Sequence, residues 1–142
     1  MKPKFVRYFM DCAELTASLS YAKRLQVGAV IVKGNQIIGT GYNGMPTGWE
    51  NNCEYTLADG TLKTKPEVLH SEMNALMKVA QSTESTTEAI MFCTVGPCID
   101  CAKAIYQAGI TTVYYKHDYR TDDGLNFLRN SGINVNQYSH GA

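Results

Sequence analysis

Residues 89–109, AIMFCTVGPCIDCAKAIYQAG, predict a strand that runs directly into a helix. The apolar run at 89–94 is typical of a buried strand. Pro97 suits the first turn of a helix, where its missing N–H costs nothing, and Gly109 is a common residue for ending one. We therefore expect a helix over Cys98–Ala108 that starts just beyond the end of the strand.

The first turn of that helix carries two cysteines. Cys98 and Cys101 are three residues apart, so they share one helix face. The partial positive charge at a helix N-terminus favours thiolate over thiol, and we expect it to prepare both sulfurs for a metal ion. His70, earlier in the chain, adds a third side chain of the kind that binds zinc. A structural zinc site normally has four such ligands, whereas a catalytic site has three and a water, so these residues predict a catalytic Zn²⁺ site.

Glu72 is the candidate catalytic residue of this site. It lies two residues from His70, which is about 200° around a helix axis, so the two side chains are poor partners for one ion. A carboxylate beside the metal can instead take a proton from a zinc-activated water, whose pKa falls far below that of bulk water toward about 7, and pass it on. Three ligands and a water complete a tetrahedron, so we expect neither His117 nor His140 to bind the ion.

Each motif alone has an ordinary explanation. A lone Cys-x-x-Cys can be a redox pair or half of a zinc knuckle, and His-x-Glu occurs on many helices. Their order, the attached Pro97 and the lack of a second Cys-x-x-Cys favour catalytic zinc. Of the other cysteines, Cys12 and Cys93 are expected to be small buried hydrophobes. Cys53 lies in a polar stretch, where a second metal site would lack identifiable partners.

The composition favours a small-molecule substrate. With 142 residues the chain fits one domain, residues 1–142. Its formal charge is zero and 18% of residues are charged, so no basic field is present to hold a nucleic-acid backbone. There is no apolar signal core at the start and no apolar run near the ~20 residues that span a bilayer. We expect a soluble, cytoplasmic protein that binds neither membrane nor nucleic acid.

The remaining pattern alternates helices and strands. A long polar loop is expected at 42–66, and alternation in the second half implies right-handed crossovers onto one sheet with helices on both faces. Both zinc motifs would open helices at one edge of that sheet, where ligands usually bind. The expected elements are helix 5–19, strands 27–32 and 36–41 joined in a hairpin by Gly34-Asn35, helix 68–80, strand 89–94, helix 98–108, strand 111–115, helix 122–130 and strand 133–135.

Further motifs surround the metal residues. With the zinc motifs they make the chain resemble the deoxycytidylate (dCMP) deaminases of the zinc-dependent cytidine-deaminase superfamily over nearly its whole length. In this resemblance the zinc motifs point only to the superfamily, and Gly-Tyr-Asn-Gly followed by Pro46 points to the dCMP branch. The segments that carry the resemblance are Arg24-Leu25-Gln26-Val27-Gly28-Ala29, Gly41-Tyr42-Asn43-Gly44-Met45-Pro46, His70-Ser71-Glu72-Met73-Asn74-Ala75, Pro97-Cys98-Ile99-Asp100-Cys101-Ala102-Lys103 and Gln107-Ala108-Gly109-Ile110.

The resemblance implies a fold and a reaction. The fold would be a cytidine-deaminase-like, three-layer α/β/α arrangement with a mixed five-stranded sheet. The reaction would be the hydrolytic conversion of dCMP to dUMP and ammonia in pyrimidine deoxynucleotide metabolism. Zinc would lie on His70, Cys98 and Cys101, with Glu72 as the proton shuttle. Many relatives have Ala where this chain has Ser71, close to the base.

The resemblance also implies substrate residues. Asn43 would lie near the sugar, and Arg24 and Tyr119 near the phosphate. Each has a plain alternative: Arg24 as a surface arginine after a helix, Tyr119 as a packing residue, and Asn43 as a residue that tolerates a left-handed turn.

Regulation is the last implication of the resemblance. Such proteins are commonly homo-oligomers, often hexamers, activated by dCTP, which Mg²⁺ can accompany, and inhibited by dTTP. The glycines of the segment 41–46 let backbone approach a ligand closely, and Lys23 is near enough in sequence to meet phosphates. The candidate effector residues are therefore Lys23, Tyr42 and Gly44, and the alternative is a plain turn after a strand. Rival functions are a free cytidine or deoxycytidine deaminase, a tRNA-editing deaminase, and a non-catalytic zinc-stabilised nucleotide-binding module. The neutral charge argues against RNA, and Glu72 against the module.

Overall fold

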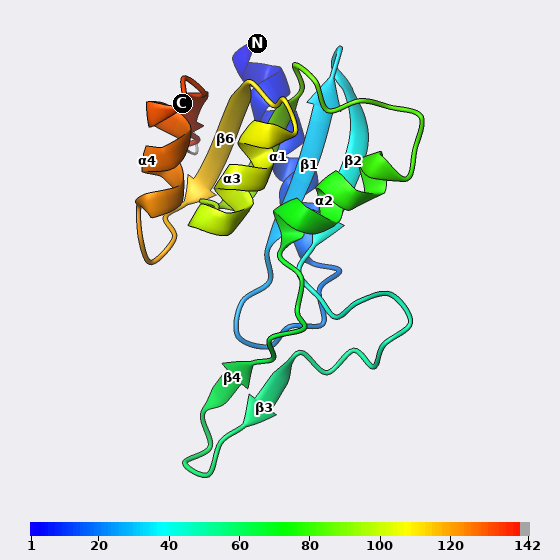
Figure 1. The fold of residues 1–142 in the computed structure, drawn as a ribbon, viewed down its shortest axis with the longest axis vertical. Helices are drawn as coiled ribbons and strands as arrows, with labels where there is room; N and C mark the ends of the chain where they lie inside the picture. Colours follow the sequence, from blue (N-terminus) through cyan, green and yellow to red (C-terminus); the bar gives the residue numbers. More distant parts are fainter. Residues whose placement is uncertain (140–142) are drawn as a thin grey trace.

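The computed structural model describes residues 1–139, in which a five-stranded sheet lies between helices (Figure 1). His140 lies outside the described residues. This is the three-layer α/β/α arrangement that the sequence pattern and the resemblance predict. The elements in chain order are α1 (Pro3–Ala17), β1 (Gly28–Lys33), β2 (Gln36–Tyr42), β3 (Glu54–Thr56), β4 (Leu62–Thr64), α2 (Ser71–Ala80), β5 (Ile90–Val95), α3 (Ile99–Gln107), β6 (Thr112–His117), α4 (Asp123–Asn130) and β7 (Asn134–Gln137).

The sheet is mixed, with the strand order β2-β1-β5-β6-β7. The hairpin partners β1 and β2 are antiparallel, as are β1 and β5. β5, β6 and β7 are parallel to one another, because helices α3 and α4 carry the chain back between them. The carboxyl end of β5 therefore points at the start of α3, which is where the two cysteines lie.

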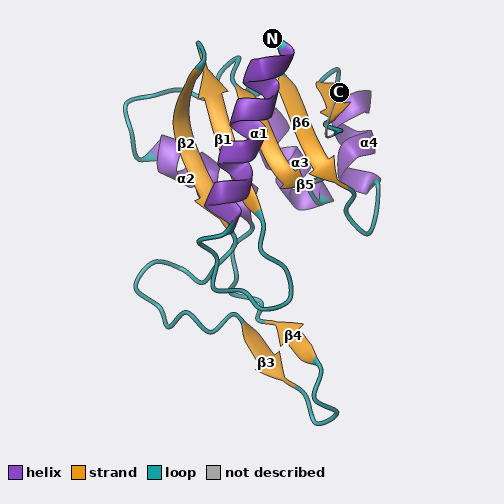
Figure 2. Cartoon of the chain, turned by 180° about the vertical axis from the view of Figure 1, so that it is seen from behind, coloured by secondary structure: helices purple, strands orange, loops and turns teal. Residues whose placement is uncertain are grey.

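Alternation along the strands divides the core into two layers. On β1, Val30 and Val32 pack under α1 with Phe9 and Phe92, whereas Ala29 and Ile31 face the opposite layer with residues of α2, α3 and α4. This period of two is what a strand buried on both faces requires. Figure 2 shows the result: α1 alone crosses one face of the sheet, and the other three helices lie behind it.

The segment 42–66 departs from the prediction of a plain loop. It contains a small antiparallel hairpin, β3–β4, in which Glu54 pairs with Thr64 and Thr56 with Leu62. The hairpin projects below the main body (Figure 1). Its strands have three residues each and are mostly exposed, so they carry no hydrophobic alternation by which sequence reasoning could find them.

Helix α2 approaches the sheet unusually closely. A Cβ at Gly41 would overlap the carbonyl oxygen of Ser71 and the amide nitrogen of Ala75, so only glycine fits there. The Asn74 side chain adds a hydrogen bond to the Tyr42 carbonyl oxygen at 2.8 Å. The first turn of α2 is thereby fixed against the end of β2. None of the helices within residues 1–139 combines the length and the apolar composition that crossing a membrane requires.

Candidate active site

The structure brings together the three side chains predicted to bind zinc. His70 directly precedes α2, Cys98 is the N-cap of α3, and Cys101 lies in the first turn of α3. Their ligand atoms all lie within 4.8 Å of one another. Among residues 1–139, this is the cluster of His, Cys, Asp and Glu side chains whose geometry suits a metal ion.

The distances within this cluster fit zinc. The Nδ1 atom of His70 is 3.4 Å from the sulfur of Cys98 and 3.4 Å from that of Cys101. Zinc bonds of about 2.3 Å to sulfur and about 2.0–2.1 Å to nitrogen place these atoms about 3.5 Å apart in a tetrahedral site. One imidazole and two thiols are also a donor set that zinc prefers. The cluster therefore needs little rearrangement to hold the ion and leaves one tetrahedral position for water.

The protonation of Cys101 differs from the sequence prediction. The helix N-terminus was expected to prepare both sulfurs as thiolates before a metal binds. Burial instead raises the pKa of the Cys101 thiol well above its usual range, and the nearby Glu72 carboxylate and Cys98 raise it further. Burial outweighs the helix dipole because a thiolate loses its hydration there. Zinc must therefore displace a proton from Cys101 when it binds.

Glu72 lies beside the metal cluster without belonging to it. It is in the first turn of α2 and only 3% exposed. The Ser71 hydroxyl donates a hydrogen bond to its Oε1 atom at 2.8 Å. Behind it, the thiol of Cys93 is fully buried, and burial first and Glu72 second raise the pKa of that thiol. The position of Glu72 suits a carboxylate that exchanges protons near a metal. The burial of Cys93 confirms the prediction that it is a core residue.

A cavity of about 430 Å³ opens in front of the cluster. That volume suits a small-molecule ligand. The predicted residues that line it are Arg24, Asn43, His70, Glu72, Cys98 and Tyr119. Lining residues that sequence reasoning missed include Glu54, Thr64 and Arg120. Arg120 had a signal, since it is a cation next to Tyr119, but Glu54 and Thr64 lie in the hairpin that no pattern indicated.

The three predicted substrate residues are held in different ways. Arg24 donates a hydrogen bond from Nη1 to the Thr64 hydroxyl at 3.0 Å. Asn43 accepts one from the Val27 N–H and donates one to the Leu25 carbonyl, both at 2.8 Å. The left-handed alternative for Asn43 is wrong, because it is not among the described non-glycine residues with positive φ. Its side chain braces the loop before β1. The ring of Tyr119 lies 5.4 Å from the guanidinium carbon of Arg120.

The candidate effector residues lie outside the lining of this cavity. The Lys78 ammonium lies 5.6 Å from the centre of the Tyr42 ring. Gly44 and Leu69 exchange two backbone hydrogen bonds, of 3.1 and 2.8 Å. The Lys23 N–H bonds to Glu54 at 2.9 Å. These contacts hold in place the segments that contain Lys23, Tyr42 and Gly44. An effector role for these three residues stays a prediction.

The other two cysteines have structural surroundings. Cys12 is half-buried against the core under α1. Cys53 is buried rather than in open solvent, and its thiol donates a hydrogen bond to the Asn51 carbonyl at 3.5 Å. Burial, then Glu54, raises the pKa of the Cys53 thiol. Within residues 1–139 it joins no group of metal-binding side chains.

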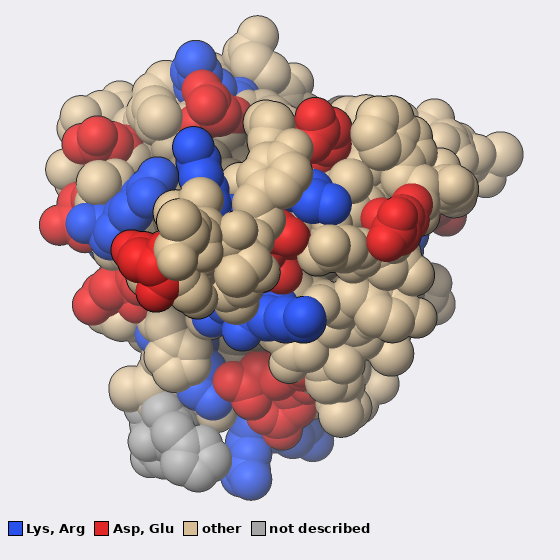
Figure 3. Space-filling model, turned by 90° about the horizontal axis from the view of Figure 1, so that it is seen from below, with Lys and Arg blue, Asp and Glu red and all other residues tan. Residues whose placement is uncertain are grey.

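Charges on the face of the molecule that is seen from below are mixed in sign. Figure 3 shows lysines and arginines interspersed with acidic side chains on the face seen from below, rather than gathered into one basic surface. This arrangement agrees with the formal net charge of zero.

The fold and the site together define a class. A three-layer sandwich that gathers one histidine, two cysteines and a buried glutamate at helix N-termini is the arrangement of the zinc-dependent deaminases. The family model described as "Cytidine and deoxycytidylate deaminase zinc-binding region" matches residues 3–117. The chain belongs to this family.

Individual relatives agree with this assignment. The chain is 34% and 37% identical to the deoxycytidylate deaminases of Schizosaccharomyces pombe and Saccharomyces cerevisiae, over 96% and 98% of its length. It spans 45% and 46% of those proteins, less than half of each. Among solved structures, the chain is similar to the dCMP deaminase from cyanophage S-TIM5, crystallised in complex with dCMP and dUMP. The two sequences are 45% identical, and the two structures superpose with a TM-score of 0.90 over 97% of this chain and 99% of that one.

Replacing Cys98 or Cys101 by Ala should abolish zinc binding, because two remaining protein ligands hold the ion poorly. Elemental analysis of purified protein should give one zinc per chain for the unsubstituted protein and almost none for either variant. Zinc affinity should also rise with pH, because the raised pKa of Cys101 keeps that thiol protonated until the ion displaces the proton. Cys12→Ala is the control and should keep its zinc; full zinc in Cys98→Ala would refute the ligand assignment.

Proposed function

We propose that this chain is a deoxycytidylate deaminase, which hydrolyses dCMP to dUMP and ammonia. The observation that carries the proposal is a buried glutamate beside a His-Cys-Cys cluster, on the lining of a cavity of about 430 Å³. The similarity to the S-TIM5 enzyme, whose structure contains dCMP and dUMP, supports the choice of substrate.

We assign roles to these residues on the basis of their positions and of the resemblance. Zinc on His70, Cys98 and Cys101 would act as a Lewis acid that makes water a nucleophile at neutral pH. Glu72 takes a proton from the attacking water and delivers protons to the ring nitrogen N3 and to the departing amino group. Water adds at C4 and ammonia leaves, so atoms and charge balance. The Ser71 hydroxyl fixes Oε1 of Glu72 and so orients the carboxylate.

We assign the phosphate end of the substrate to the arginines of the cavity lining. Arg24 and Tyr119 line the cavity, and Arg120 adds a second guanidinium beside the carboxylate of Asp118. Arginine binds phosphate through several charge-assisted hydrogen bonds. Asn43 lies on the same lining, and by resemblance we place it near the sugar. The amide of Asn43 still has one N–H that the described residues do not use.

Glu72→Gln should keep zinc and lose about 10²–10⁴-fold in kcat, because an amide preserves the shape but cannot accept the proton. Ammonia release should be measured on dCMP, deoxycytidine, cytidine and dCTP side by side, with dCMP the best substrate of the unsubstituted protein. Glu67→Gln replaces an exposed carboxylate just before α2 and should leave the rate unchanged. A loss below about tenfold in Glu72→Gln would remove Glu72 from the shuttle role.

Arg24→Ala and Tyr119→Phe should raise KM for dCMP far more than KM for deoxycytidine. Only the monophosphate can accept the charge-assisted hydrogen bonds that these side chains would donate. Steady-state kinetics on both substrates measures the difference, and Arg7→Ala on α1 serves as an arginine control remote from the cavity lining. Equal losses on the two substrates would give Arg24 and Tyr119 a role in the fold instead.

The regulation that we propose comes from the resemblance. The protein would be a homo-oligomer, such as a hexamer, activated by dCTP with Mg²⁺ and inhibited by dTTP, with Lys23, Tyr42 and Gly44 in the effector site. The hydrogen bonds between Gly44 and Leu69, which directly precedes His70, support a route from that segment to the metal cluster.

Adding dCTP with magnesium should turn a sigmoidal dependence of rate on dCMP into a hyperbola, and dTTP should reverse the change. The coupling should shift the half-saturating dCMP concentration by roughly 5–150-fold. Light scattering under the same conditions gives the oligomeric state. A hyperbola that neither nucleotide moves would refute the regulation and leave the deaminase proposal intact.

A further inference from the structure

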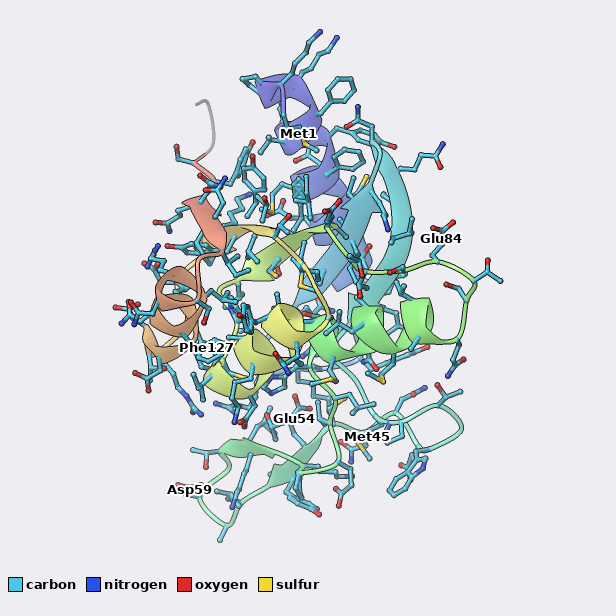
Figure 4. The ribbon with its side chains drawn as sticks, turned by 45° about the horizontal axis from the view of Figure 1, so that its top comes forward. Met1, Met45, Glu54, Asp59, Glu84 and Phe127 are labelled. Carbon is cyan, nitrogen blue, oxygen red and sulfur yellow. The ribbon has the colours of Figure 1, made fainter. Side chains whose placement is uncertain are left out.

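Glu54 is a buried carboxylate whose two oxygens have different surroundings. It is the first residue of β3 and is 4% exposed. Its Oε2 atom accepts hydrogen bonds from the backbone N–H groups of Lys23 and Arg24, at 2.9 and 3.1 Å. Its Oε1 atom is buried and has no hydrogen-bond partner among the described residues. Figure 4 shows Glu54 where the hairpin meets the main body, away from the hairpin tip at Asp59.

A buried carboxylate with one unpaired oxygen lowers the free energy of unfolding, so a role in stability alone does not explain Glu54. Removing a carboxylate from water costs free energy that only full hydrogen bonding recovers. Half of this carboxylate is unsatisfied, so the two hydrogen bonds at Oε2 recover only part of the cost of burying it. A buried polar atom without a partner calls for another explanation, and its position next to the catalytic cavity supplies one.

The segment that Glu54 holds carries Arg24. Residues 20–27 connect α1 to β1 and form no helix or strand. Asn43 braces the end of this segment through Leu25 and Val27. Glu54 fixes the middle of the segment by accepting hydrogen bonds from the backbone N–H groups of Lys23 and Arg24. Without that anchor, the backbone of an exposed loop residue would have several orientations.

Both strands of the hairpin contribute to the position of Arg24. Glu54 on β3 holds its backbone N–H, and Thr64 on β4 accepts one hydrogen bond from its guanidinium at 3.0 Å. Glu54 forms no ion pair with that guanidinium among the described residues. The charge of Arg24 and most of its five N–H donors therefore stay available for an anion in the cavity.

We propose that Glu54 is a positioning residue that acts through Arg24 in the recognition of the substrate phosphate. The carboxylate accepts the two N–H groups of residues 23 and 24 and thereby aims the guanidinium at the phosphate end of the cavity. The inference rests on the proposed function in one respect, namely that the substrate is a monophosphate.

The test is a cycle of Glu54→Ala, Arg24→Ala and the double variant, with kcat and KM measured on dCMP and deoxycytidine. Glu54→Ala should raise KM for dCMP by roughly tenfold or more, since it removes two charge-assisted hydrogen bonds, and should change kcat and the constants for deoxycytidine little. In the Arg24→Ala background, the same substitution should have almost no further effect on dCMP, because residues that act through one another are not additive.

Glu54→Gln keeps the proposal testable if the alanine variant folds poorly. The amide carbonyl can accept both backbone N–H groups, so KM for dCMP should stay within about threefold of the unsubstituted value. Asp59→Ala is the matched control: this carboxylate lies on the same hairpin and accepts bonds from the Thr61 N–H and hydroxyl, at 3.0 and 2.6 Å, without touching residues 20–27. It should leave the preference for dCMP over deoxycytidine unchanged.

Calorimetric binding of dUMP and deoxyuridine to the same zinc-loaded variants separates this inference from the proposed function. Weaker dUMP binding in Glu54→Ala, with unchanged deoxyuridine binding and no additivity with Arg24→Ala, supports the positioning role even if turnover fails. Additive effects, equal losses with and without the phosphate, or a glutamine variant as impaired as the alanine variant would overturn it. Absence of dCMP turnover by the unsubstituted protein with these couplings intact would refute only the deaminase proposal.

Discussion

The structure depends on one constraint: two helices must begin at the same edge of the sheet, close enough for their first residues to share an ion. Helix α2 reaches this position because Gly41 has no Cβ to collide with Ser71 and Ala75. A Cβ at Gly124 would likewise overlap the carbonyl oxygen of Pro97, so α4 can support the turn into α3 only with glycine there. The 3.4 Å distances between His70 and the two sulfurs follow from these backbone contacts.

Periodicity explains why the main body was predictable from the sequence. The strand and helix at 89–109 are bounded by Pro97 and Gly109, and both occur in the structure as β5 and α3. The alternation of β1 and the spacing of apolar residues in α2 each match one face of the core. The convergence of the His and Cys motifs followed from the same reasoning, because parallel crossovers bring helix starts to one edge.

Features that depend on tertiary contacts were not predictable in this way. The β3–β4 hairpin has no apolar pattern, and Glu54 is buried only because the loop at residues 20–27 folds over it. The protonation of Cys101 was predicted wrongly because the local rule for a helix N-terminus takes no account of burial, which is set by the rest of the fold. Thr64 becomes a partner of Arg24 across forty residues of sequence, a relation that no spacing rule contains.

The location of these missed features has a physical reason. Chemistry at the metal requires groups held within fractions of an ångström, and rigid helix starts on a packed sheet provide that. Under the proposed function, selection among cytidine-like substrates would concern the far end of the ligand, where a phosphate must be distinguished from a free hydroxyl. Loops and a polar hairpin can change there without disturbing the core. The Glu54 carboxylate accepts two backbone N–H groups through one oxygen and so holds the loop at residues 20–27. It forms no ion pair with the guanidinium of Arg24 among the described residues. The two hydrogen bonds from Glu54 to residues 23 and 24 thus fit the proposed role in substrate recognition.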